Sequence, residues 1–91
     1  MDTGVLDLTE STPARAHMLE ASVTLSEPQS RLYLRLPPGD AGRAEAVFHK
    51  RSWAAKHYWR EEPGITVYEF DEPLPAGLIA LRIPFRAARR L

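Results

Sequence analysis

Alternating apolar and polar residues in two short segments constrain the fold of this chain more than any other feature of its sequence. Every second residue of 19–25 is apolar, and residues 31–36 repeat the pattern with leucine at every second position. A side-chain period of two is that of a β-strand, so each segment predicts a strand with one buried face. The segment SEPQS between them has turn composition, which predicts that the two strands form an antiparallel hairpin.

The next segment, residues 41–60, predicts a helix. It contains no proline, Asp40 is suited to cap it, and Pro63 follows its expected end. On a helix that turns by about 100° per residue, most apolar side chains of the segment fall on one stripe. A single strand over residues 45–54 would mix apolar and charged residues on both faces, which favours the helix. The stripe consists of Ala44, Val47, Phe48, Ala54, Ala55, Tyr58 and Trp59.

Residues 65–70 and 78–85 predict a second hairpin, because they are β-branched, aromatic or alternating in character. The predicted order is strand, strand, helix, strand, strand. It indicates an α+β fold in which one helix packs on a four-stranded, largely antiparallel sheet, with a β-sandwich as the alternative. A single helix covers only one face of such a sheet, so we expect the other face to be solvated or to pair with a second copy in a homodimer.

The chain is expected to form one small domain, because 91 residues suffice for a single modest core. Residues 1–16 are rich in Asp, Thr, Ser and Pro and predict a flexible arm, residues 17–86 the α+β domain, and residues 87–91 a basic tail. The beginning of the chain is acidic, and no apolar run approaches the ~20 residues of a membrane span. These features predict a cytoplasmic protein without a membrane partner.

Catalytic, metal-binding and cofactor-binding patterns are not found in the sequence. The chain has no cysteine, which excludes disulfides, thiolate zinc sites and cysteine nucleophiles. On the predicted helix, His49 and His57 would lie about 12 Å apart, too far to share a metal ion. The carboxylate pairs at 61–62 and 71–72 fall at predicted turns, where their side chains diverge. We therefore predict a protein that is not an enzyme and needs no metal or cofactor.

The candidate binding site lies on the far side of the predicted helix. Trp53 falls opposite the apolar stripe, so it is expected to face solvent among cationic and imidazole side chains. An exposed indole of this kind either fills a pocket on a protein partner or stacks on a nucleic-acid base. The predicted binding residues are Trp53, His49, Lys50, Lys56, His57 and Arg60.

The charge distribution helps to choose between these partners. Residues 31–60 carry seven basic and two acidic side chains, whereas the whole chain carries 12 of each sign. A neutral chain has no long-range field that steers it onto nucleic acid. We therefore expect a non-catalytic protein-interaction or oligomerisation module, acting as a homodimer or in a larger protein assembly. A nucleic-acid-binding domain that uses the basic helix face around Trp53 is the alternative.

One segment, VYEFDEPLPAGLIALRIPF (67–85), has a local resemblance. It is similar to the late strand, turn and strand in the N-terminal β-domain of zinc-dependent aminopeptidases, where such sequences join two strands of a sandwich. The resemblance covers about a fifth of the chain. It implies a strand, a turn and a strand, and it carries over no catalytic residue because the HExxH helix that holds the zinc in that family is absent here.

Overall fold

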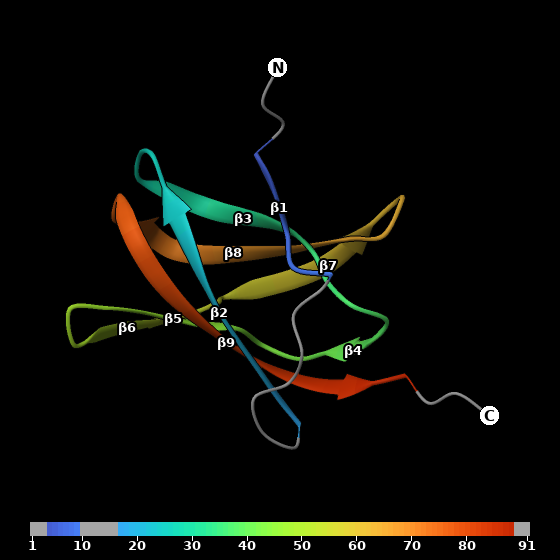
Figure 1. The fold of residues 1–91 in the computed structure, drawn as a ribbon. Helices are drawn as coiled ribbons and strands as arrows, with labels where there is room; N and C mark the ends of the chain where they lie inside the picture. Colours follow the sequence, from blue (N-terminus) through green and yellow to red (C-terminus); the bar gives the residue numbers. More distant parts are fainter. Residues whose placement is uncertain (1–3, 10–16, 89–91) are drawn as a thin grey trace.

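The structure is a computed structural model that describes residues 4–9 and 17–88. Within these residues all regular elements are strands (Figure 1). The predicted α+β fold is therefore wrong, and the β-sandwich alternative fits the structure. The strands are β1 (Val5–Asp7), β2 (Met18–Leu25), β3 (Gln29–Arg35), β4 (Gly39–Ala41), β5 (Glu45–Phe48), β6 (Arg51–Ala54), β7 (His57–Glu61), β8 (Ile65–Leu74) and β9 (Gly77–Ala87).

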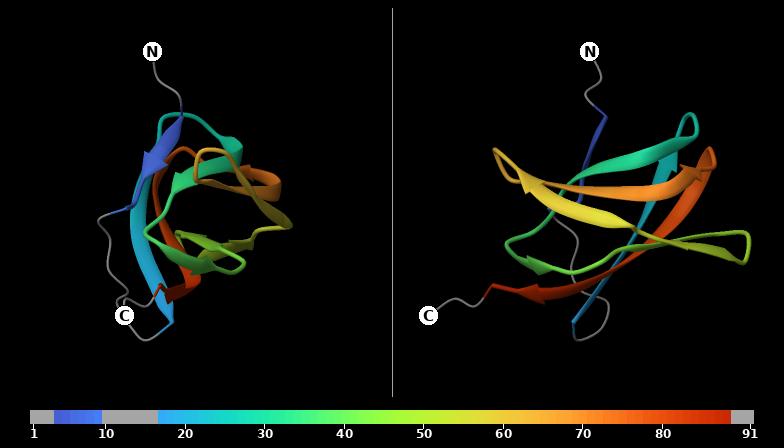
Figure 2. Two further views of the ribbon diagram at one scale, coloured as in Figure 1. Left: turned by 90° about the vertical axis from the view of Figure 1, so that its right-hand side faces the viewer. Right: turned by 180° about the vertical axis from the view of Figure 1, so that it is seen from behind.

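The strands form two sheets that face each other (Figure 2). One sheet has the order β1-β3-β8-β7 and the other the order β2-β9-β5-β6, with β4 pairing alongside the end of β9. Neighbouring strands are antiparallel except β1 and β3, which run parallel. Within the described residues, β1, β7, β2 and β6 end the two strand orders, and β4 pairs on one side only, so these five strands present sheet edges.

Apolar side chains from the inner faces of both sheets form one hydrophobic core. The alternation predicted for residues 19–25 and 31–36 is confirmed, because Leu19 and Leu34 are fully buried. Glu20 and Ser22, which alternate with the buried residues of β2, are exposed. A sandwich needs this pattern on every strand, since each strand has one face in the core and one face outside.

The two predicted hairpins are wrong, although their strands exist. β2 pairs with β9 over its whole length, while β3 pairs with β8 in the other sheet. β8 and β9 likewise follow each other in the chain and lie in different sheets. Each of these strands has one apolar face, and consecutive strands bury these faces by stacking across the core. Alternation predicts which face is buried but leaves the pairing partner open.

The predicted helix over 41–60 is also wrong. This segment contains the end of β4 followed by β5, β6 and β7. The β5–β6 hairpin turns at His49 and Lys50, whose φ angles are 48° and 66°. The turn places Ala46 opposite Trp53, so an even-numbered residue before the turn shares a face with an odd-numbered residue after it. If residues 45–54 are instead treated as one unbroken strand, each face contains both apolar and charged residues, which is why the sequence favoured a helix.

The predicted arm and tail are described only in part. Residues 5–7, inside the predicted arm, form β1 beside β3. The remaining arm residues 1–3 and 10–16 and the tail residues 89–91 lie outside the described residues. Residues 67–85 form most of β8 and β9, two strands of a sandwich joined by a turn, as the local resemblance implied.

Candidate functional site

The structure separates five of the six predicted binding residues into two groups, and the sixth, Trp53, lies in the core. His49 and Lys50 form the tip of the β5–β6 hairpin, which projects from one end of the sandwich (Figure 1). Lys56, His57 and Arg60 lie on or directly before β7, which runs toward the other end. The predicted single surface therefore does not exist, and although His57 and Arg60 share β7, they point to opposite faces of it.

The prediction that Trp53 faces solvent is wrong. Its side chain belongs to the core cluster, and only 9% of the residue is exposed. Arg51 lies over the ring at 4.6 Å from its centroid, and the indole Nε1 is 3.4 Å from a carboxylate oxygen of Glu72. Trp53 is buried because the β5–β6 turn places it on the inner face, opposite Ala46.

Three of the seven cations of residues 31–60 pair with acidic residues of the last third of the chain. Each of these ion pairs joins a neighbouring strand or loop on the surface, and each removes a cation from any basic patch. The Arg43 guanidinium also donates to the carbonyl of Ala55 at 2.7 Å. Of the cations in the predicted binding site, Lys56 forms such an ion pair, and no ion pair within the described residues involves Lys50 or Arg60. The pairs are Arg31–Glu69 at 3.1 Å, Arg51–Glu72 at 3.6 Å and Lys56–Asp71 at 3.3 Å.

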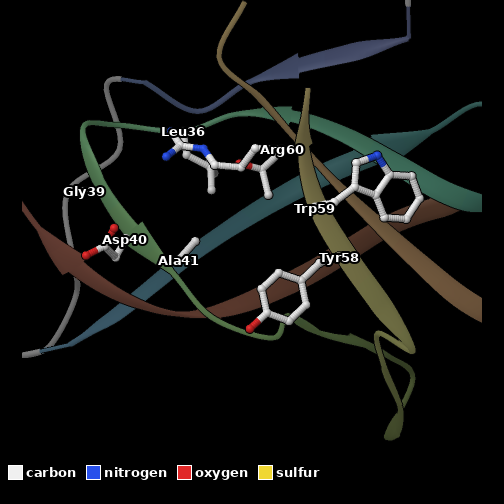
Figure 3. Close-up of a pocket in the computed structure, with 8 residues that line it drawn as sticks. Leu36, Gly39, Asp40, Ala41, Tyr58, Trp59 and Arg60 are labelled. Carbon is white, nitrogen blue, oxygen red and sulfur yellow. The ribbon is translucent and has the colours of Figure 1, made fainter. Parts of the chain in front are cut away.

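β7 is the element where side chains suited to binding gather. Tyr58 and Arg60 are opposite Tyr68 and Thr66 of β8, which are buried, so both point toward the side of the core. Trp59 alternates with them and points to the outside (Figure 3). Tyr58 remains 42% exposed because β7 is the last strand of its sheet.

A pocket of about 170 Å³ opens beside β7 (Figure 3). β7 forms one wall, and the segment that leads from β3 into β4 forms the other. Asp40, Tyr58 and Arg60 contribute polar groups, and no hydrogen bond or ion pair engages their side chains within residues 4–9 and 17–88. The lining residues are Leu36, Gly39, Asp40, Ala41, Tyr58, Trp59, Arg60 and Thr66.

Thr66 forms the floor of this pocket. It is the buried polar residue of the described core, with 5% of its surface exposed. Its hydroxyl has no hydrogen-bond partner in the described part of the chain, and yet no buried side-chain oxygen there is left unsatisfied. The hydroxyl therefore reaches the pocket, where water or a ligand can bind it.

Tyr68 holds the floor and one wall of the pocket in place. Its ring stacks on that of Tyr58, with centroids 5.5 Å apart, and its hydroxyl donates to the carbonyl of Gly42 at 2.6 Å. Burial raises the pKa of Tyr68, and the neighbouring Tyr58 adds to this effect. Tyr68 therefore stays neutral and keeps its proton for the hydrogen bond.

The outer side of β7 is also ordered. The indole Nε1 of Trp59 donates to a carboxylate oxygen of Glu61 at 2.9 Å, and Arg31 lies 5.4 Å from the ring centroid. Val67, opposite Trp59 on β8, is fully buried although it lies outside the core cluster. Trp59 therefore covers its own strand neighbour and is fixed by two polar contacts.

The described residues offer neither a metal site nor a membrane-spanning helix. Within residues 4–9 and 17–88, no three His, Cys, Asp or Glu side chains are grouped as metal ligands. The same residues include no helix that is long and apolar enough to cross a membrane.

The site residues Asp40, Tyr58, Trp59 and Thr66 were not among the predicted binding residues. Tyr58 was placed on a buried helical stripe and Asp40 was given a capping role. Their contribution depends on two sheets meeting at one edge, and no local pattern reports that meeting. Comparison with known protein families, with curated proteins and with solved structures gave no match.

Proposed function

We propose that this chain is a non-catalytic protein-interaction module that binds an extended segment of a partner protein along the free edge of β7. The observation that carries the proposal is the combination of an edge strand and an adjoining pocket whose polar side chains Asp40, Tyr58 and Arg60 have no hydrogen-bond or ion-pair partner among residues 4–9 and 17–88. An edge strand offers unpaired backbone N–H and C=O groups to an incoming strand. The partner would thus extend the β1-β3-β8-β7 sheet by one strand.

The side chains of β7 support binding by a protein. Tyrosine, tryptophan and arginine are the residue types that contribute most to protein interfaces, and Tyr58, Trp59 and Arg60 follow one another on this strand. Tyr58 is stacked on Tyr68, and Trp59 is bonded to Glu61, so both are held before a partner arrives. Side chains that are already ordered lose less conformational entropy on binding.

The pocket supports recognition of one partner side chain. On an added strand every second side chain points toward the core side, and one of them would enter the pocket. Arg60 and Thr66 can donate hydrogen bonds there, and Asp40 accepts them. A carboxamide side chain, as in Asn or Gln, has both an acceptor and a donor and matches this set.

Selection from a displayed library of random peptides tests the proposal. Peptides enriched on the wild-type protein are expected to bind the Arg60→Glu variant at least about tenfold more weakly. Ser52→Glu is the matched control, because Ser52 is exposed on the edge strand β6 of the other sheet. An absence of enriched peptides would contradict the proposal, as would equal binding to both variants.

A further inference from the structure

The edge strands of the two sheets differ in a way that singles out β2. β1 has 3 residues and β6 has 4, whereas β2 has 8. β7 has 5 residues, of which Arg60 and Glu61 are charged. Natural sheet edges are usually protected by shortness, charge, proline or a bulge. β1 and β6 have such protection through their shortness, and β7, the edge proposed above to bind a peptide, is 3 residues shorter than β2.

β2 lacks these devices. Its only charged residue is Glu20, it contains no proline, and its register with β9 runs from Met18 to Leu25 without a shift. Within the described residues, no strand pairs with the other side of β2. An edge that is long, regular and nearly uncharged is a template for pairing with another strand.

Apolar side chains are left partly uncovered on the same side of the sandwich. β1 and β2, the edge strands of the two sheets, lie on this side (Figure 2). Leu6 of β1 and Ala21 of β2 pack against the core but are only partly buried. A partner along β2 would bury these side chains further and would also pair the strand edge.

We propose that β2 pairs antiparallel with β2 of a second copy of this chain and forms a symmetric dimer. Facing residues of an antiparallel pair point to the same side of the sheet, so the inner residues of one β2 must meet inner residues of the other. A two-fold axis through Ser22 meets this condition. It places Leu19 opposite Leu25 of the second copy, and Ala21 opposite its Val23.

The charge pattern of β2 agrees with this register. The axis through Ser22 places Glu20 opposite Thr24 of the second copy, so no like charges face each other. An axis through Glu20 would instead bring the Glu20 side chains of the two copies face to face, and the repulsion between their like charges disfavours that register. A two-fold contact of this kind uses the same strand of both copies and therefore closes at two.

The dimer leaves the proposed peptide site free. β7 is at the edge of its sheet opposite to β1, and β1 lies on the side of β2. The dimer would present two β7 edges, one on each outer side. The inference rests on β2 and stands independently of what β7 binds.

Sedimentation equilibrium over a wide range of protein concentration tests the dimer. The variant Ser22→Lys/Thr24→Lys adds two charges at exposed positions of β2, and Ser52→Lys/Ala54→Lys adds them at exposed positions of β6, at the opposite edge of the same sheet. The β2 variant is expected to raise the dimer Kd at least about tenfold, while the β6 variant leaves it unchanged. Thermal unfolding of both variants checks that the fold is retained.

A wild-type protein that stays monomeric at all concentrations would overturn the proposal. Equal Kd values for the two lysine variants would overturn it as well, because the dimer would then use another surface.

A single introduced cysteine tests the register, because the natural chain has none. Facing residues on antiparallel strands have Cα atoms about 4.5–5.5 Å apart, within the range that a disulfide spans. Ser22→Cys is therefore expected to form a covalent dimer with oxidised glutathione much faster than the control Ser52→Cys. Equal rates for the two variants would overturn the register centred on Ser22.

Discussion

Tyr68 stabilises the structure through its specific contacts as well as through its burial. It is fully buried on β8, supports Tyr58 by stacking and bonds the backbone at Gly42. It thereby connects the β1-β3-β8-β7 sheet with the segment that leads into β5. The pocket beside β7 depends on this connection, because its two walls come from these two parts of the chain.

Replacing Tyr68 with Phe tests this role. The variant keeps the ring and its stacking on Tyr58 but leaves the carbonyl of Gly42 without its donor. We expect the free energy of unfolding to fall by about 1–2 kcal/mol, measured by urea denaturation. Tyr33→Phe is the control, because Tyr33 lies on the outer face of β3 and is only partly buried. A loss of similar size in the control would contradict the assigned role.

The raised pKa of Tyr68 adds a dependence on pH. An unfolded tyrosine ionises near its ordinary pKa of 10.0, whereas folded Tyr68 keeps its proton to a higher pH. The folded state therefore binds more protons above that pH, so its stability is complete below about pH 10 and falls as the pH rises further. Tyr68→Phe lacks this loss, and urea denaturation of both proteins between about pH 8 and 11 should show their stabilities converging.

At the scale of the elements, strands with regular alternation were predictable and tight turns without signature residues were not. Residues 19–25 and 31–36 alternate, and both predicted strands and their buried faces are confirmed. The β5–β6 turn at His49 and Lys50 lacks the Asn-Gly or Asp-Gly pair that usually marks such a hairpin. Without that signal, two short strands resemble one amphipathic helix.

The candidate site was also only partly predictable, because it depends on which strands pair and which strand lies at a sheet edge. His57 and Arg60 on β7 were among the predicted binding residues because cationic and imidazole side chains are visible in a sequence, and Arg60 lines the pocket. The pocket was not predicted, because it forms only where β7 lies beside β4 and the segment before it. The pairing of β7 with β8, which brings β7 there, is not encoded in any short sequence pattern. Edge position, which leaves Tyr58 exposed, is likewise a property of the whole sheet.

The β5–β6 turn makes a prediction of its own. Positive φ angles strain residues with a side chain, and Lys50 has a φ of 66°. Replacing Lys50 with Gly removes this strain, so we expect the free energy of unfolding to rise by about 0.5–1 kcal/mol in urea denaturation. Ser52→Gly, in the adjoining strand, should lower stability instead. A loss of stability in Lys50→Gly would contradict the strained turn.

For the molecule as a whole, β9 is the strand on which the most pairings depend. It pairs with β2, β5 and β4, so three segments from different parts of the chain lie along it. Its inner residues Ile79, Leu81 and Ile83 are at most 1% exposed. The sandwich can form only after these distant segments reach β9, and such long-range pairing makes folding slow relative to helical proteins of similar size.

The same substitution, Leu→Ala, at two positions of β9 tests whether this strand has one buried and one exposed face. Leu81 is 1% exposed and lies between Ala21 of β2 and Ala46 of β5, whereas Leu78 is 64% exposed on the outer face. Leu81→Ala leaves a cavity between the sheets and should lower the free energy of unfolding by about 2–5 kcal/mol. Leu78→Ala removes the same atoms from the surface and should change it by less than about 0.5 kcal/mol. Both are measured by urea denaturation at low protein concentration, where self-association does not contribute. Similar losses for the two variants would mean that β9 does not have one buried and one exposed face, and a two-sheet sandwich would then be ruled out.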